Sequence, residues 1–93
     1  MKPVTTVLVS RSAEKQINRL PQHIQEALRY WVETVQIIGI RETRKLSGYH
    51  DEPLKGHRLG ERSARLNRAY RVIYTVTDNE IEITAIEVNK HAY

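Results

Sequence analysis

Arg71 is the residue whose surroundings most clearly indicate a chemical role. It lies between Tyr70 and Val72 in the apolar segment 69–76, so its guanidinium must either reach solvent or bind an anion. If this segment pairs with the one before it as a neighbouring strand, Arg71 emerges on the same face as Arg65. An arginine carries a rigid fork of donors that fits two phosphate oxygens at once. The two residues are therefore either ordinary solvent-facing arginines or part of a phosphate clamp.

Positive charge is concentrated in the middle third of the chain. Residues 41–71 carry nine basic and four acidic residues, a balance of +5, and seven of the nine are arginine. The balance is +2 over residues 1–40 and −3 over residues 72–93, which gives a net charge of +4. A charge run is usually a solvated face, but phosphate neutralisation needs a local patch of this kind. The distribution therefore favours a polyanionic partner.

Length and composition indicate one soluble domain that spans residues 1–93. The chain has 93 residues, 40% of them hydrophobic, so it can bury one small core. It has no cysteine, which excludes disulfides and thiolate metal sites and fits a reducing cytoplasm. The N-terminus has no cleavage site, and its apolar run is too short to span a bilayer. We therefore expect a cytoplasmic protein without a membrane partner.

Hydrophobic periodicity predicts the elements that must position the arginines. A short β-branched strand is followed by two helical segments, and the second of these has its natural stop at Gly39. The elements expected up to residue 60 are a strand over 4–9, helices over 13–20 and 24–38, a short basic helix over 40–46 and a loop region over 47–60.

The last third of the chain is predicted to be strand. Three segments with strand patterning cover 62–66, 69–76 and 80–88, with a tight hairpin turn at 77–79. Alternate residues of the middle strand, beginning at Tyr70, are expected to face the helices. The order β-α-α-β-β-β predicts an α+β domain in which an N-terminal helical hairpin packs on a small, mainly antiparallel sheet.

The sequence resembles the RelE/ParE superfamily of bacterial toxins, and within it the mRNA endonucleases of the RelE, YoeB and HigB type. The similarity extends over essentially the whole chain. Its motifs are Glu52-Pro53-Leu54-Lys55-Gly56, Arg65, Ala69-Tyr70-Arg71-Val72-Ile73-Tyr74 and the ending His91-Ala92-Tyr93. The resemblance implies a RelE-like fold and the toxin of a type II toxin–antitoxin system.

The resemblance also implies a reaction. Such toxins enter the ribosomal A site and cut mRNA by attack of a ribose 2′-hydroxyl on the neighbouring phosphate, with neither a metal nor a cofactor. Arg71 matches the phosphate-contacting arginine and Glu52 the general base, and His91 and Tyr93 match a C-terminal pair that supplies acid–base function and base stacking. In YoeB-like members that pair is adjacent, whereas Ala92 separates it here. The residues expected to contact mRNA or ribosomal RNA are Lys55, Arg58, Arg62, Arg65, Arg68 and Lys90.

Other interpretations remain open at the level of sequence. The same superfamily includes ParE-type toxins that poison DNA gyrase without cutting RNA, and an inert RNA-binding module would keep the basic patch. A metal site is not expected, because His50, Asp51 and His57 lack the spacing of a ligand set. Either kind of toxin implies a cognate antitoxin with an acidic or amphipathic arm, and contact with operator DNA only indirectly through that antitoxin.

Overall fold

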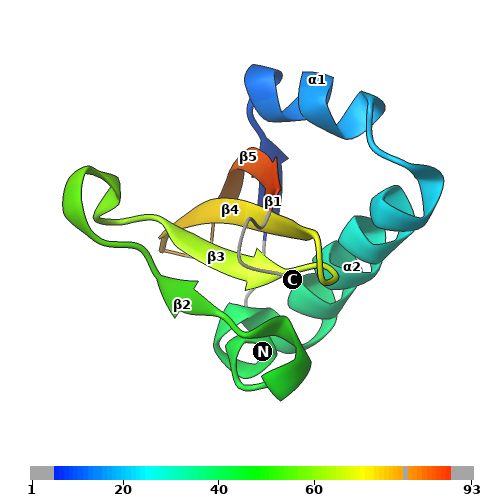
Figure 1. The fold of residues 1–93 in the computed structure, drawn as a ribbon. Coiled ribbons are helices and arrows are strands. Elements are labelled where there is room, and N and C mark those ends of the chain that lie inside the picture. Colours follow the sequence, from blue (N-terminus) through cyan, green and yellow to red (C-terminus); the bar gives the residue numbers. More distant parts are fainter. Residues whose placement is uncertain (1–5, 79, 89–93) are drawn as a thin grey trace.

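The computed structural model describes residues 6–78 and 80–88, which form one five-stranded sheet with two α-helices (Figure 1). The elements in chain order are β1 (Thr6–Val9), α1 (Arg11–Asn18), α2 (Gln22–Arg44), β2 (Glu52–Pro53), β3 (Arg62–Arg65), β4 (Tyr70–Thr77) and β5 (Glu80–Val88). The strand order is β1-β5-β4-β3-β2, with β1 parallel to β5 and every other pair antiparallel. The predicted α+β class and the order β-α-α-β-β-β are confirmed, with β2 as an additional short strand.

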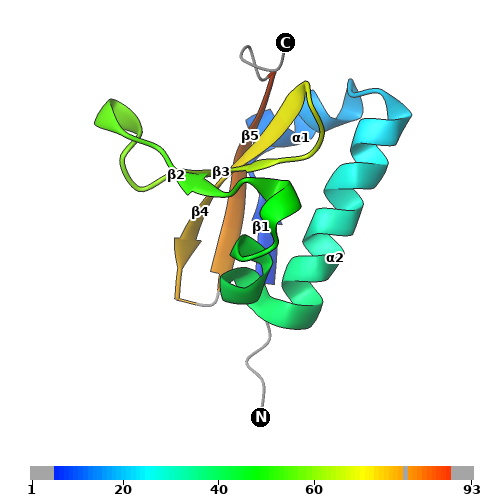
Figure 2. The same cartoon turned by 60° about the horizontal axis from the view of Figure 1, so that its bottom comes forward.

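The α2 helix covers one face of the sheet and contributes Leu28, Trp31 and Val35 to the core (Figure 2). Trp31 is fully buried and lies against Tyr74 of β4, with ring centroids 5.1 Å apart and planes tilted by 53°. Val72 and the partly buried Tyr70 and Val76 join the same cluster. Alternate residues of β4 therefore face the helix, as the sequence predicts. None of the described helices is long and apolar enough to cross a membrane.

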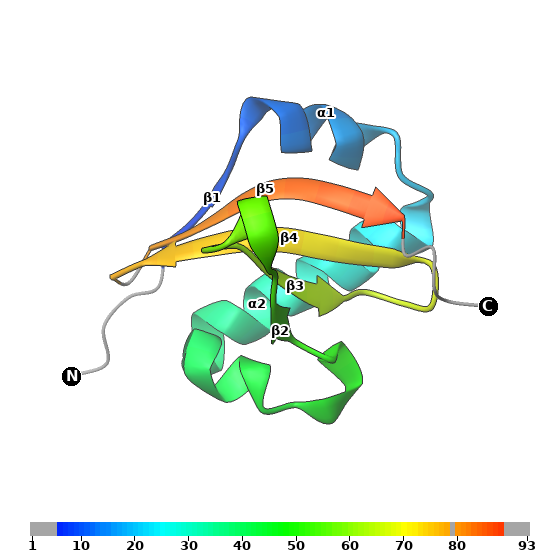
Figure 3. The ribbon, with the colours of Figure 1, turned by 60° about the vertical axis from the view of Figure 1, so that its left-hand side comes forward.

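The α1 helix lies beside β5, where β1 has ended (Figure 3). Ser10 begins the helix, because its hydroxyl accepts a hydrogen bond from the backbone of Ala13 at 3.1 Å. One helical turn further on, Gln16 accepts a hydrogen bond from the backbone N–H of Ile86 at 2.8 Å. This side chain takes the place of a strand neighbour, so α1 satisfies a donor on the edge of β5, while its buried Ala13 joins the core cluster that α2 also contributes to.

Gly39 divides α2 into two helices that meet at a kink. Its backbone has φ 84° and ψ 161°, a conformation that glycine alone adopts at low cost. Helical hydrogen bonding resumes at once and continues to Arg44, and the buried Thr43 donates to the Gly39 carbonyl at 2.7 Å. The predicted helix end at Gly39 and the predicted short basic helix after it are therefore both confirmed, and α2 consists of these two helices in direct succession.

The loop expected over residues 47–60 contains one strand that the sequence patterning missed. Glu52 and Pro53 pair with Ser63 and Arg62 of β3. Two short 3₁₀ turns, Ser47–Tyr49 and Gly56–Arg58, flank this strand. The pairing gives Glu52 a fixed place at the edge of the sheet.

Candidate functional site

The face of the sheet turned away from α2, here called the outer face, carries a row of charged side chains across three strands. Arg65 of β3 lies opposite Arg71 of β4, and Arg71 lies opposite Glu87 of β5. Directly opposed residues project on the same side of a sheet. The prediction that Arg65 and Arg71 share a face is thus confirmed. The third member of the row is the Glu87 carboxylate.

Glu52 belongs to the neighbouring row of the same face. It is the cross-strand partner of Ser63, which in turn lies opposite Ile73, whose side chain is on the Arg71 side of β4. Glu52 itself is exposed, whereas Ser63 and Ile73 are buried. The outer face therefore combines an exposed carboxylate at the β2 edge with the arginine row one step along the strands.

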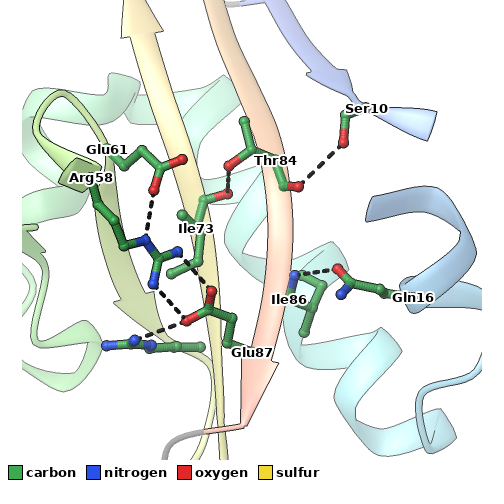
Figure 4. A network of polar contacts seen from close by, with 9 residues as sticks. Ser10, Gln16, Arg58, Glu61, Ile73, Thr84, Ile86 and Glu87 are labelled. Carbon is green, nitrogen blue, oxygen red and sulfur yellow. Dashed lines mark hydrogen bonds and ion pairs between the residues drawn. The ribbon is translucent and has the colours of Figure 1, made fainter. Parts of the chain in front are cut away.

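Glu87 holds two arginines at once (Figure 4). Its Oε1 accepts hydrogen bonds from Arg58 Nη1 at 3.1 Å and Arg71 Nη2 at 2.9 Å. Its Oε2 accepts from Arg58 Nη2 at 2.7 Å. The hydrogen bonds from Arg58 are the main cause that holds the pKa of Glu87 below its ordinary value, against the opposing effect of burial.

Arg58 reaches this position from a closed excursion of the chain between β2 and β3. The excursion begins and ends with the backbone bond from Leu54 N–H to the Glu61 carbonyl, 2.9 Å long. Gly56 and Gly60 adopt φ of 69° and 101°, which permits the tight reversal. Within it, Arg58 Nε donates to Glu61 at 2.9 Å, and hydrogen bonds to Glu87 and Glu61 raise the pKa of Arg58 further above its already high ordinary value.

The two arginines differ in how completely they are bound. Arg58 uses Nε, Nη1 and Nη2, all on carboxylate oxygens. Arg71 has one ion pair, through Nη2, and its Nε is buried without a hydrogen-bond partner among the described residues. Both side chains are about equally accessible, 28% for Arg58 and 27% for Arg71. Arg71 therefore has unused hydrogen-bonding capacity at the centre of the row.

A second ion pair lies on the opposite side of the sheet and anchors the start of β2. The Asp51 side chain is 1% exposed; its Oδ1 accepts a hydrogen bond from Arg62 Nε at 2.7 Å and lies 2.7 Å from Arg62 Nη2 in an ion pair. Its Oδ2 accepts from the Tyr74 hydroxyl, and burial followed by this bond raises the pKa of Tyr74. Because Asp51 directly precedes Glu52, the Asp51–Arg62 ion pair fixes the backbone position from which Glu52 projects.

The structure brings some of the predicted residues together and separates others. Lys55 and Arg68 are exposed and Arg65 is half-buried. Arg62 lies on the α2 side, bound to Asp51, and Arg58 is bound within the outer-face network. Lys90, His91 and Tyr93 lie outside the described residues. The described part of β5 ends at Val88, which lies opposite Tyr70, at the end of the sheet where Arg71 lies.

Glu87 is a functional candidate that strict strand alternation misses. The register of β4 against β5 shifts between Ile73 and Tyr74, and this shift brings Glu87 onto the face of Arg71. The available signal was the spacing of core residues in β5: Ile81 and Ile83 are two apart, but Ile86 follows after three. An odd spacing between buried positions of one strand indicates a bulge.

Comparisons with known proteins establish the fold. No family model matches the chain, and no curated protein matches it. Three solved structures that it resembles are the archaeal RelE–RelB complex from Pyrococcus horikoshii, the YoeB dimer from Staphylococcus aureus and the DinJ–YafQ toxin–antitoxin complex from E. coli.

The structural likeness extends over nearly the whole of each chain. The TM-scores are 0.74, 0.72 and 0.70 in that order, at 21%, 20% and 22% sequence identity. The matches cover 96%, 94% and 92% of this chain and 99%, 99% and 93% of the others. The chain therefore has the fold of RelE/ParE superfamily toxins.

Proposed function

We propose that this protein is the toxin of a type II toxin–antitoxin pair and cuts mRNA on the ribosome. The observation that carries the proposal is the outer face, where Arg65 and Arg71 lie side by side and Glu52 occupies the next row. An enzyme that cleaves RNA without a metal needs positive charge at the reacting phosphate and a carboxylate or imidazole within reach. The shared fold with RelE, YoeB and YafQ proteins supports the same assignment.

The proposed reaction is an internal displacement at phosphorus. Glu52 removes the proton of a ribose 2′-hydroxyl, and the 2′-oxygen forms a bond to the adjacent phosphorus. The bond to the 5′-oxygen breaks, and an acid protonates that leaving oxygen. Arg71 stabilises the charge that builds up on the phosphorane. We assign the acid and base-stacking roles to His91 and Tyr93, which lie outside the described residues and come after Val88 in the sequence.

RNA contacts outside the reacting phosphate fall to the cations that are not bound inside the molecule. Lys55 and Arg68 are exposed, and Arg65 lies in the arginine row. We propose these three, together with Lys90, as contacts to the RNA backbone. Arg58 and Arg62 are held by carboxylates in this structure, so a role in positioning other groups suits them better.

The proposed partner is a cognate antitoxin. One of the solved structures that this chain resembles, DinJ–YafQ from E. coli, is a toxin–antitoxin complex. An antitoxin arm rich in acidic residues would complement the basic segment 41–71 and cover the outer face.

The test of the proposal is Arg71→Ala. We expect this change to abolish growth arrest and to lower the rate of mRNA cleavage on translating ribosomes by about 10²–10³-fold, the usual cost of removing one group that stabilises transition-state charge. The control is Arg29→Ala, which removes one exposed arginine from α2. This variant should cut mRNA at the rate of the unaltered protein.

Two outcomes would contradict the proposal. An Arg71→Ala variant that is folded and still cuts at full rate would exclude the assigned site. DNA damage that appears before any loss of mRNA would instead indicate a gyrase poison of the ParE type.

A further inference from the structure

We propose that Glu87 is an internal counter-anion that occupies the place of a substrate phosphate on Arg71, and that Arg58 holds it there. The inference rests on the proposed function, because the anion that displaces Glu87 is taken to be a phosphate of single-stranded RNA. It assigns Glu87 and Arg58 as positioning residues and leaves Arg71 as the residue that changes partner.

The Glu87 carboxylate is bound more strongly by Arg58 than by Arg71. Arg58 contacts both of its oxygens, at 3.1 and 2.7 Å, whereas Arg71 contacts only Oε1, at 2.9 Å. Displacement from Arg71 therefore breaks one hydrogen bond and leaves the two bonds to Arg58 in place. A paired arrangement of two N–H donors on one carboxylate is the stronger geometry. Glu87 can thus leave Arg71 without becoming a lone charge.

The second argument is that Arg71 is incompletely satisfied. Its Nε has no hydrogen-bond partner among the described residues, although the atom is buried. A buried donor without an acceptor costs free energy that a better acceptor recovers. A phosphate has oxygens enough to accept from Nε and Nη2 together. At Arg71, a carboxylate that accepts one hydrogen bond can therefore be exchanged favourably for a phosphate that accepts two.

The third argument is that Arg58 is itself fixed from the other side. Glu61 accepts from Arg58 Nε at 2.9 Å, so each N–H edge of this guanidinium faces a carboxylate. The excursion that carries both residues is closed by the backbone bond between Leu54 and Glu61. Glu61 therefore keeps Arg58, and with it Glu87, in place whether or not Arg71 is occupied by a ligand.

The experiment measures binding of a short single-stranded RNA in which every ribose is 2′-O-methylated, so that it cannot be cut. We expect Glu87→Gln to bind this RNA more tightly than the unaltered protein. The slope of the logarithm of affinity against the logarithm of salt concentration should change by much less than about 0.7, the value for one further phosphate neutralised on a single strand, because Arg71 contacts one phosphate in both proteins.

Glu82→Gln is the matched control. Glu82 lies on the same strand and opposite Thr75, hence on the same face as Glu87, and it is exposed with no ion pair to the described residues. The two variants change the net charge equally. If Glu87→Gln gains no more affinity than Glu82→Gln, the effect is general electrostatics and the inference is wrong.

The identity of the released arginine is tested by a double variant. In an Arg71→Ala background, the gain from Glu87→Gln should disappear, because the two changes act on one contact. A gain that persists without Arg71 would assign the phosphate site to Arg58 and overturn the inference.

A measurement on the unaltered protein covers the case in which Glu87→Gln does not fold. Nuclear magnetic resonance of the arginine Nε–H groups should show the Arg71 signal moving when the methylated RNA is added, while the Arg58 signal on Glu61 stays. Equal movement of both signals would contradict the assigned roles. Both readouts use neither the ribosome nor cleavage, so they remain decisive if the proposed nuclease activity fails its own test.

Discussion

Arg71 shows how a single buried-strand arginine constrains what surrounds it. A guanidinium between Tyr70 and Val72 needs solvent or an anion. The chain supplies the anion itself, as Glu87. A carboxylate in this position keeps the arginine extended and oriented before any substrate arrives, which is the kind of preorganisation that electrostatic catalysis requires.

The stabilising effect of Glu87 should depend on pH in a defined direction. Hydrogen bonds from Arg58 hold the pKa of Glu87 below its ordinary value of 4.5 in the folded state. The unfolded chain therefore binds a proton more readily, so this stabilisation is complete above about pH 4.5 and is lost as the pH falls through the lower folded pKa. We expect the unaltered protein to have a higher free energy of unfolding than Glu87→Gln at neutral pH, and the difference to shrink on acidification.

Urea denaturation of both proteins across this pH range measures the difference directly. A gap that stays constant from neutral to acidic pH would mean that the charge of Glu87 does not contribute and that only its shape matters.

The β2 strand illustrates how a very short element can be held in place from outside itself. Its two residues make few backbone contacts of their own. The buried Asp51 just before it binds Arg62 of β3 and the Tyr74 hydroxyl of β4, so three strands meet at one carboxylate. The position of Glu52 therefore depends on this carboxylate as well as on the pairing of β2 with β3.

Removal of this anchor should destabilise the protein. Asp51→Ala leaves the Arg62 charge unpaired and the Tyr74 hydroxyl without its acceptor, and we expect a loss of about 2–4 kcal/mol in the free energy of unfolding. Glu42→Ala is the control, because it breaks an exposed ion pair with Lys45 and should cost less than about 0.5 kcal/mol. Thermal or urea unfolding compares the two, and equal effects would show that the buried pair has no special role.

The elements could be predicted from sequence where their periodicity is regular and long. The α2 helix and the facing of alternate β4 residues toward it follow from such patterns, and the confirmed pairing of Arg65 with Arg71 follows from two regular strands. The short β2 strand has too few residues to show a period. The helix end at Gly39 could be predicted as well, because glycine adopts the positive φ found there at low cost.

The network around Glu87 could not be predicted for a different reason. It depends on the register shift between Ile73 and Tyr74 and on a reversal through Gly56 and Gly60. Both are tertiary features that reorient a side chain without changing the local composition. The sequence therefore indicates which arginine is the candidate, while its partner emerges only from the three-dimensional register.

At the level of the whole molecule, the basic middle third is less free than its charge suggests. Four of its nine cations are in ion pairs, namely Lys45, Arg58, Arg62 and Arg71. Three others, Lys55, Arg65 and Arg68, form no ion pair to the described residues and belong to or adjoin β2 and β3. The remaining two, Arg41 and Arg44, lie in the last turn of α2 and also form no ion pair to the described residues. The unpaired positive charge is thus divided between the β2–β3 end of the sheet and the end of α2.

This distribution predicts which arginines set the salt dependence of RNA binding. Arg65→Ala and Arg68→Ala should each lower the steepness of affinity against salt concentration by about 0.7, because each removes one phosphate contact on a single strand. The loss should be similar for RNAs of different sequence, since backbone contacts carry no sequence information. Arg29→Ala on α2 removes the same charge from the opposite side of the sheet and should leave the slope unchanged. Titration of the methylated RNA at several salt concentrations separates these cases. If the salt dependence weakens equally in all three variants, the protein attracts RNA through its net charge alone. The outer face would then not be the RNA-binding surface.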